Sequence, residues 1–207
     1  MRTQRKQAVT DLKRGLILDA ARKVFELEGL EGASLRSIAR EAGYTPGAIY
    51  FHFPNKEAIY AGLLDQSLDA LTAAVDEACA AGTSAQLRLL AAAMAFFDFY
   101  HRNPRDLDLG FYLFRGGMRP HGLGAEFDRE LNMKLQRSLA PVGDAARELG
   151  ADDMLGRRLI AGFFAHAVGL LLLAHTRRIR LFEEDARGLC EAFVQHMLTD
   201  LERGSPC

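Results

Sequence analysis

The chain has 207 residues, enough for one large domain or two smaller ones with a real core. Hydrophobic residues make up 49% and charged residues 26%, an ordinary soluble globular balance, and the net charge of −1 excludes a uniformly basic nucleic-acid binder. The charge is nevertheless uneven. Residues 1–56 hold ten Lys and Arg against six acids, so a head of charge +4 precedes a body of charge −5. This asymmetry is expected if only the head meets a polyanion.

Apolar residues recur with helical spacing along the whole chain, and no segment shows the alternation typical of strands. Ser34, Thr45 and Asn55 are placed to cap the helices that follow them, and Pro46 occupies a first helical position, where its missing N–H costs nothing. Gly29 and Gly43 are expected to end helices. The predicted helices span about 11–28, 35–42, 46–53, 56–80, 84–102, 105–115, 123–149, 152–178 and 183–202.

The second and third predicted helices have the spacing of a helix-turn-helix. Ala39 is small where a larger side chain would hold the two helices apart, Gly43 suits a turn with positive φ, and Ile49 can fill the space between them. The helix 11–28 would brace the pair from behind. The predicted fold is therefore all-α, with roughly nine helices. We expect a DNA-binding domain over 1–54 and an effector-binding and dimerisation domain over 55–207.

The row of rings from Tyr50 to Phe53 is too bulky to be buried on one side of a helix. Short side chains in "TPGA" allow the start of this helix to enter a major groove closely. The Tyr50 hydroxyl and Lys56 can then reach phosphates, while Phe51 and Phe53 are expected to anchor the helix to its neighbours. The ring cluster is thus predicted to be shared between DNA and core.

The stretch "GAIYFHFPNKEAI", preceded by "SLRSIAREAGYTP", closely resembles the signature of the TetR/AcrR transcriptional regulators over residues 11–60. The resemblance implies a DNA-binding, non-enzymatic fold. Thr45 is the only polar residue in "TPGA", so Arg36 is the expected direct reader of guanine. His52 is equally open to a packing role, and the basic tail of Arg2, Arg5 and Lys6 to solvation. By matched position, base contact falls to Arg36, Thr45, Pro46, Gly47 and Ala48, and phosphate contact to Ser34, Tyr50, His52 and Lys56.

Seven of the 18 aromatic residues fall between Phe96 and Phe114, which fits either an aromatic core or an apolar cavity lined by rings. The histidines lack metal-ligand spacing, and no P-loop, GxGxxG or GxSxG motif occurs, so neither cofactor nor metal is expected. The candidate effector-binding residues are Phe97, His101, Phe111, Phe114, Arg115 and His166.

The run 159–174 is apolar nearly all round but shorter than the roughly 20 residues of a membrane span. Packing of two copies through the last two helices would explain it. The charged N-terminal segment is not followed by the apolar h-region of a signal peptide, and the cysteines form no CxxC pair, so a cytoplasmic location is expected. The predicted dimer surface comprises Ile160, Phe163, Phe164, Ala167 and Leu171 on one helix and Leu189, Phe193, Met197 and Leu201 on the other.

These features predict a homodimeric, ligand-responsive repressor that an apolar or aromatic effector releases from a palindromic double-stranded operator. An alternative is a small-molecule binding or sequestering protein whose DNA head is vestigial. A helical enzyme is a weaker alternative, because no catalytic motif supports it.

Overall fold

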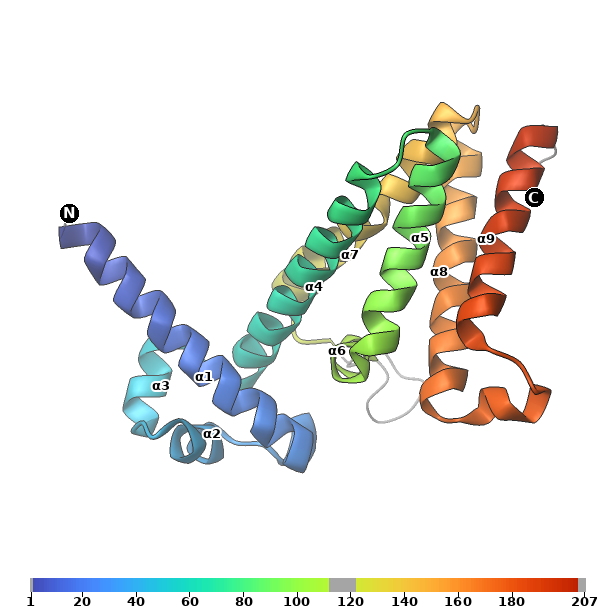
Figure 1. Cartoon of the computed structure of the whole chain (residues 1–207). Coiled ribbons are helices and arrows are strands. Elements are labelled where there is room, and N and C mark those ends of the chain that lie inside the picture. The colour runs from blue at the N-terminus through green and yellow to red at the C-terminus, as the bar shows by residue number, and fades with distance from the viewer. Residues whose placement is uncertain (1, 112–121, 205–207) are drawn as a thin grey trace. The chain divides into compact units, whose positions relative to one another are not determined.

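The computed structural model describes residues 2–111 and 122–204, and all regular secondary structure in this part of the chain is helical, as predicted (Figure 1). It contains nine α-helices and one short 3-10 helix, η2. The bounds are α1 Arg2–Gly32, α2 Leu35–Ala42, α3 Pro46–His52, α4 Lys56–Ala80, α5 Ala85–Arg102, α6 Pro104–Gly110, α7 Ala125–Glu148, α8 Asp153–His175, η2 Arg178–Phe182 and α9 Ala186–Arg203.

The predicted capping residues are confirmed. The side-chain oxygens of Ser34, Thr45 and Asn55 each accept a hydrogen bond from the backbone N–H three residues further on, at 3.0, 3.3 and 2.7 Å. Gly43 ends α2 in the left-handed conformation, with φ of 70°. Each cap satisfies an N–H that the first turn of a helix leaves without an internal partner.

Two helix boundaries differ from the prediction. The first helix begins at Arg2 rather than near Asp11, and it breaks at Gly29, where φ is 69° and ψ is 174°, before continuing to Gly32. The expected helix 152–178 ends at His175, because Arg177 adopts a left-handed conformation with φ of 59° and η2 follows. Part of the predicted helix 105–115 lies outside the described residues.

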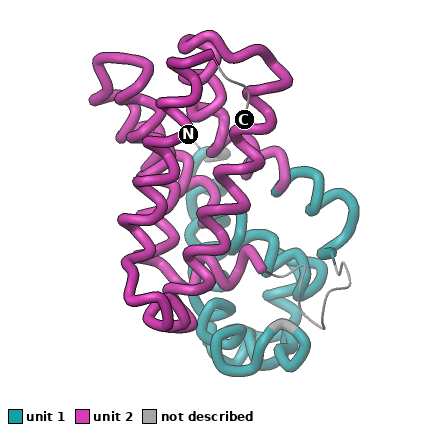
Figure 2. The backbone as a smooth tube through the Cα atoms, turned by 90° about the vertical axis from the view of Figure 1, so that its right-hand side faces the viewer, with its two compact units in different colours: residues 1–66, 112–131 teal, residues 67–111, 132–207 magenta. Residues whose placement is uncertain are grey.

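The chain divides into two compact units, drawn in teal and magenta in Figure 2. The first comprises residues 1–66 with 112–131, of which 122–131 are described, and the second comprises 67–111 with 132–207. The helix α4 contributes to both units. The core of the first unit includes Ile17, Ala21, Val24 and Phe25 of α1, Ile38 and Ala39 of α2, Ile49 of α3 and Ile59, Tyr60 and Leu63 of α4.

An aromatic cluster forms the centre of the second unit. The ring of Phe96 lies edge-on to Tyr100, Phe163 and Phe164, at centroid separations of 5.3, 5.7 and 6.0 Å. Phe96 and Phe163 are fully buried. Edge-to-face packing of this kind stabilises a core beyond the area it buries. These rings therefore join α5 to α8.

The predicted dimer surface spans α8 and α9, and more than half of its residues are buried within the protomer. Phe163, Ala167 and Leu171 have no exposed area and Met197 is 4% exposed, because these side chains face the core of their own protomer. Ile160, Phe164, Leu189 and Phe193 are half-buried, and Leu201 is buried. After the exposed Arg157 and Arg158, the exposed positions of α8 up to residue 174 are apolar and mostly small: Ala161, Gly162, Ala165, Gly169 and Leu172.

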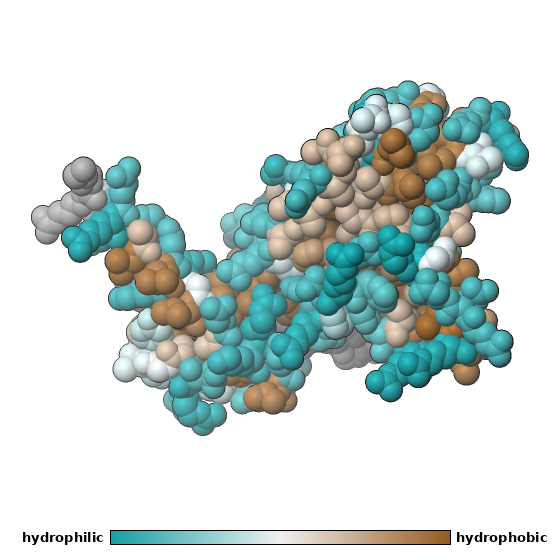
Figure 3. Space-filling view, in the orientation of Figure 1, coloured by the Kyte–Doolittle hydropathy of each residue, from teal (hydrophilic) through white to brown (hydrophobic). Residues whose placement is uncertain are grey.

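Among the described residues, one helix, α8, is long and apolar enough to cross a membrane by length and composition. It is partly buried within the second unit, where 28% of its most apolar 18-residue stretch is buried. Apolar residues are also exposed in the first unit, where hydrophobic atoms lie along the amino-terminal part of α1 (Figure 3). Val9, Leu12 and Leu16 are 48%, 65% and 48% exposed.

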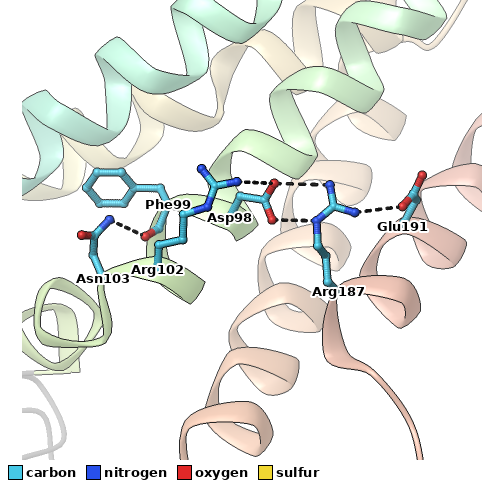
Figure 4. A network of polar contacts seen from close by, with 6 residues as sticks. All are labelled: Asp98, Phe99, Arg102, Asn103, Arg187 and Glu191. Atoms are coloured by element: carbon cyan, nitrogen blue, oxygen red, sulfur yellow. Dashed lines mark hydrogen bonds and ion pairs between the residues drawn. The ribbon is translucent and has the colours of Figure 1, made fainter.

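A polar network connects α5 to α9 (Figure 4). The Arg187 guanidinium donates two hydrogen bonds to the Asp98 carboxylate, at 2.9 and 3.3 Å, and a third to Glu191 at 3.2 Å. Arg102 also approaches Asp98, at 3.5 Å. The Asp98 side chain is only 16% exposed, whereas that of Arg102 is 76% exposed. The forked contact with Arg187 is thus the more protected of the two ion pairs.

We predict that Arg187→Met lowers the free energy of unfolding by about 1 kcal/mol, because it leaves a mostly buried carboxylate without its bidentate partner. The matched change Arg102→Met should cost less than about 0.5 kcal/mol, since an exposed ion pair contributes little. Urea denaturation of both variants checks this difference. Equal losses in the free energy of unfolding would show that the forked contact stabilises the protein no more than the exposed ion pair does.

Candidate DNA-binding site

The helices α2 and α3 form the predicted helix-turn-helix. Ala39 is 1% exposed and Ile49 has no exposed area, so the small residue and the residue that fills the interhelical space are both buried as expected. The Tyr44 N–H donates to the Ala39 carbonyl at 2.9 Å, which closes the turn after Gly43. The sequence spacing therefore corresponds to a tight, hydrogen-bonded corner in the structure.

Four residues with predicted DNA contacts line one surface depression of about 510 Å³. Ser34 and Arg36 come from the start of α2, Tyr50 from α3 and Lys56 from the start of α4. Residues separated by more than 20 positions in the sequence are thus brought together. The remaining lining residues are Ala33, Leu35, Pro54, Asn55 and Glu57.

Positive groups outnumber negative ones in this depression, where Arg36 and Lys56 face the single carboxylate of Glu57. The amino ends of α2 and α4 both open onto it, and such ends carry partial positive charge and unsatisfied N–H groups. Arg36 is exposed and adds a full positive charge, as does Lys56, whose Nζ also donates to the Glu31 carbonyl at 3.3 Å. The arrangement fits a DNA phosphate, with Arg36 exposed beside it.

The start of α3 is open to solvent. Thr45, Pro46 and Gly47 are exposed, and Ala48 is half-buried. A side-chain carbon added at Gly47 would meet no atom within 4 Å, so this edge has free space in front of it. Tyr50 is 59% exposed one turn further on. Short side chains at this end allow close approach to the floor of a groove.

The two phenylalanines of the ring cluster have different environments. Phe53 is 1% exposed, which confirms its predicted anchoring role, but Phe51 is 82% exposed, so the same prediction for Phe51 is wrong. The short helix can direct only part of its circumference at α1 and α4, and Phe51 lies on the other side. Its ring contacts His52 edge-on, with centroids 5.1 Å apart.

His52 does not line the depression. Burial lowers the pKa of its imidazole, and the positive charges of Lys13 and Arg14 lower it further. The ring is therefore predominantly neutral at pH 7, and it can offer a phosphate one N–H rather than a cation.

One residue that sequence reasoning missed contacts the end of α3. The Nη1 atom of Arg14 donates to the His52 carbonyl at 2.8 Å, and its guanidinium carbon lies 4.2 Å from the centre of the Phe53 ring. Arg14 lies in the predicted bracing helix and outside the motif stretches that begin at Ser34. No local signal in the sequence identifies it, because its partners are 38 residues away.

The predicted effector-binding residues are not brought together into one cavity. Phe97 is fully buried and its ring lies 5.4 Å from His101, which is exposed, while Phe111 is half-buried. His166 stacks on Phe193 at a centroid distance of 4.0 Å. Phe114 and Arg115 lie outside the described residues. A depression of about 350 Å³ does include His101, next to His175 and η2.

The fold and this surface define the class of protein. Residues 17–63 match the family model described as "Bacterial regulatory proteins, tetR family". The chain is 36% identical over 101 residues to the HTH-type transcriptional activator FasR of Mycolicibacterium smegmatis, covering 49% of this chain and 46% of FasR. It is 48% identical over 50 residues to the A-factor receptor protein of Streptomyces griseus, covering 24% of this chain and 18% of that protein.

Residues 17–63 thus carry the amino-terminal domain of the TetR family of bacterial transcription regulators. The matches of the chain span less than half the length of these curated relatives. Among solved structures, FadR from Bacillus subtilis in complex with stearoyl-CoA has a similar fold. Its TM-score is 0.66 at 19% identity, over 87% of this chain and 95% of that one.

Proposed function

We propose that the protein is a ligand-responsive repressor that binds a palindromic operator as a homodimer and is released by a small effector. The depression at the amino ends of α2 and α4 carries this proposal, because it places Arg36, Tyr50 and Lys56 around one concavity. The exposed start of α3 lies beside Tyr50 and would enter the major groove. FasR is named an activator, so the sign of regulation needs a reporter assay.

We expect binding to a duplex selected from a random-sequence library to weaken steeply with salt, because phosphate contacts release counterions. Arg36→Ala should cost about 1–3 kcal/mol and relax preference at one position in each half-site. Lys56→Met should weaken all duplexes alike. Fluorescence anisotropy over a salt series measures these effects. An affinity that is insensitive to salt would support the alternative of a sequestering protein with a vestigial head.

Dimerisation is proposed through the exposed face of α8. Ala161, Gly162, Ala165 and Gly169 present little more than backbone, and a side-chain carbon added at either glycine would meet nothing within 4 Å. Small residues of this kind let a second helix approach closely, and exposed apolar surface on α8 favours covering by a partner. A self-complementary contact between two copies would give the two-fold symmetry that a palindromic site requires.

Ala165→Arg should produce monomers, because two-fold symmetry places the unpaired charge in the interface twice. Operator affinity should fall with it, although the head is unchanged. Ala73→Arg is the matched control, since Ala73 is an exposed helical residue of α4 away from this face. Sedimentation velocity distinguishes the species, and a dimeric Ala165→Arg variant would show that another face is used.

The effector is proposed to be an apolar or aromatic molecule with a polar or anionic end. The buried rings of the second unit offer apolar walls, and the Nε2 atom of His166 is buried without a hydrogen-bond partner in the described part of the chain. A buried polar atom of this kind is available to a ligand. The helix α4 extends from the head into the second unit, so displacement of its second half offers a route to operator release.

We expect His166→Phe to keep the stack on Phe193 but to weaken an effector that hydrogen-bonds His166 by about tenfold, the loss of one hydrogen bond of about 1.4 kcal/mol. Stearoyl-CoA, stearate and planar aromatic carboxylates form the panel, scored by thermal shift and operator release. His196→Phe, at an exposed position of α9, is the control. Equal responses from both variants would place the effector site elsewhere.

A further inference from the structure

The helix α3 is the recognition helix, the one that would enter the major groove, and its own interactions are too few to fix its position. Pro46–His52 is seven residues long, about two turns, and an isolated helix of that length is unstable in water. Its amino end is capped by Thr45, and Ile49 anchors its middle. At its carboxyl end, the backbone carbonyls of the last turn have no partners within the helix. Something outside α3 must determine where that end lies.

We propose that Arg14 is the positioning residue for the recognition helix, fixing its carboxyl end and thereby the place where its amino end meets DNA. This inference rests on the proposed DNA-binding function. Arg14 precedes the segment 17–63 that matches the family model, so the role is assigned from the contacts of this chain alone.

Two contacts made by different parts of one side chain fix the geometry. The Nη1 edge donates to the His52 carbonyl at 2.8 Å, and the guanidinium lies over the Phe53 ring at 4.2 Å. Phe53 is itself buried, so the ring is an immobile platform. A positive group at a helix carboxyl end also opposes the negative end of the helix dipole. Lysine reproduces the charge but not the planar stack with a forked donor.

A small displacement of the carboxyl end of α3 also moves its amino end. A seven-residue helix is about 10 Å long at 1.5 Å per residue, so a tilt of about 10° moves its far end by about 2 Å. Hydrogen bonds to base edges tolerate only about 0.5 Å of variation in donor–acceptor distance. Loss of the Arg14 contacts should therefore damage sequence-specific binding more than general attraction to DNA.

Direct phosphate contact by Arg14 is the competing explanation, and it predicts a different result. A residue that contacts phosphate weakens binding to every sequence and lowers the salt slope by about one charge when it is removed. A positioning residue lowers the preference for the selected sequence. Lys13 is the matched control, because it is a neighbouring exposed cation on the same helix.

The experiment compares the wild-type protein with Arg14→Lys, Arg14→Met and Lys13→Met. Two duplexes are used: one selected by the wild-type protein from a random library, and a scrambled duplex of the same composition. We expect Arg14→Lys to bind the selected duplex at least tenfold more weakly, with the scrambled affinity within about twofold and the salt slope unchanged. Lys13→Met should lower both affinities equally.

A second, independent measurement uses the protein without DNA. Arg14 contributes to the lowered pKa of His52, so Arg14→Met should raise that pKa in an NMR titration of the imidazole, whereas Arg14→Lys should leave it low. Thermal melts show whether each variant is folded. Persistence of the His52 signal in Arg14→Lys, together with lost discrimination, separates misplacement of α3 from unfolding.

Two results would overturn the inference: wild-type discrimination by Arg14→Lys, or equal losses on both duplexes with a reduced salt slope in Arg14→Met. A wild-type protein that does not distinguish the two duplexes would instead remove the proposed function itself.

Discussion

The placement of a two-turn helix is the constraint on which the DNA-binding head depends. The helix α3 is too short to form alone, so it takes its position from the buried Ile49, from the Thr45 cap and from the contacts of Arg14 at its other end. The rest of the first unit supports this arrangement. The long helix α1 packs against α2 and supplies the guanidinium at the carboxyl end of α3.

The same packing brings together groups that favour an anion. The starts of α2 and α4 are distant in sequence, yet both open onto one depression that Tyr50 of α3 also lines. Two helix amino ends and the charges of Arg36 and Lys56 then act on a single site. Their combined attraction for an anion is stronger than that of any one of them. Folding thus gathers part of the excess positive charge of the first 56 residues at one site.

In the second unit, α8 has a buried side and an exposed side, and apolar residues occur on both. Phe163, Ala167 and Leu171 are buried against the protomer's own helices, whereas Ala161, Gly162, Ala165, Gly169 and Leu172 remain outside. A helix that is apolar nearly all round therefore does not reveal which of its residues are exposed. The position of a residue around the helix axis decides, because only the side toward neighbouring helices is covered.

The sequence alone determined the helical class, the caps at Ser34, Thr45 and Asn55, and the helix-turn-helix, because these depend on local periodicity and on hydrogen bonds only three residues apart. Only the tertiary structure decided which rings are buried, as the opposite environments of Phe51 and Phe53 show. It also decided the role of Arg14, whose partner carbonyl is 38 residues away. Contacts at that separation leave no local pattern, since they arise only when packing brings distant segments together.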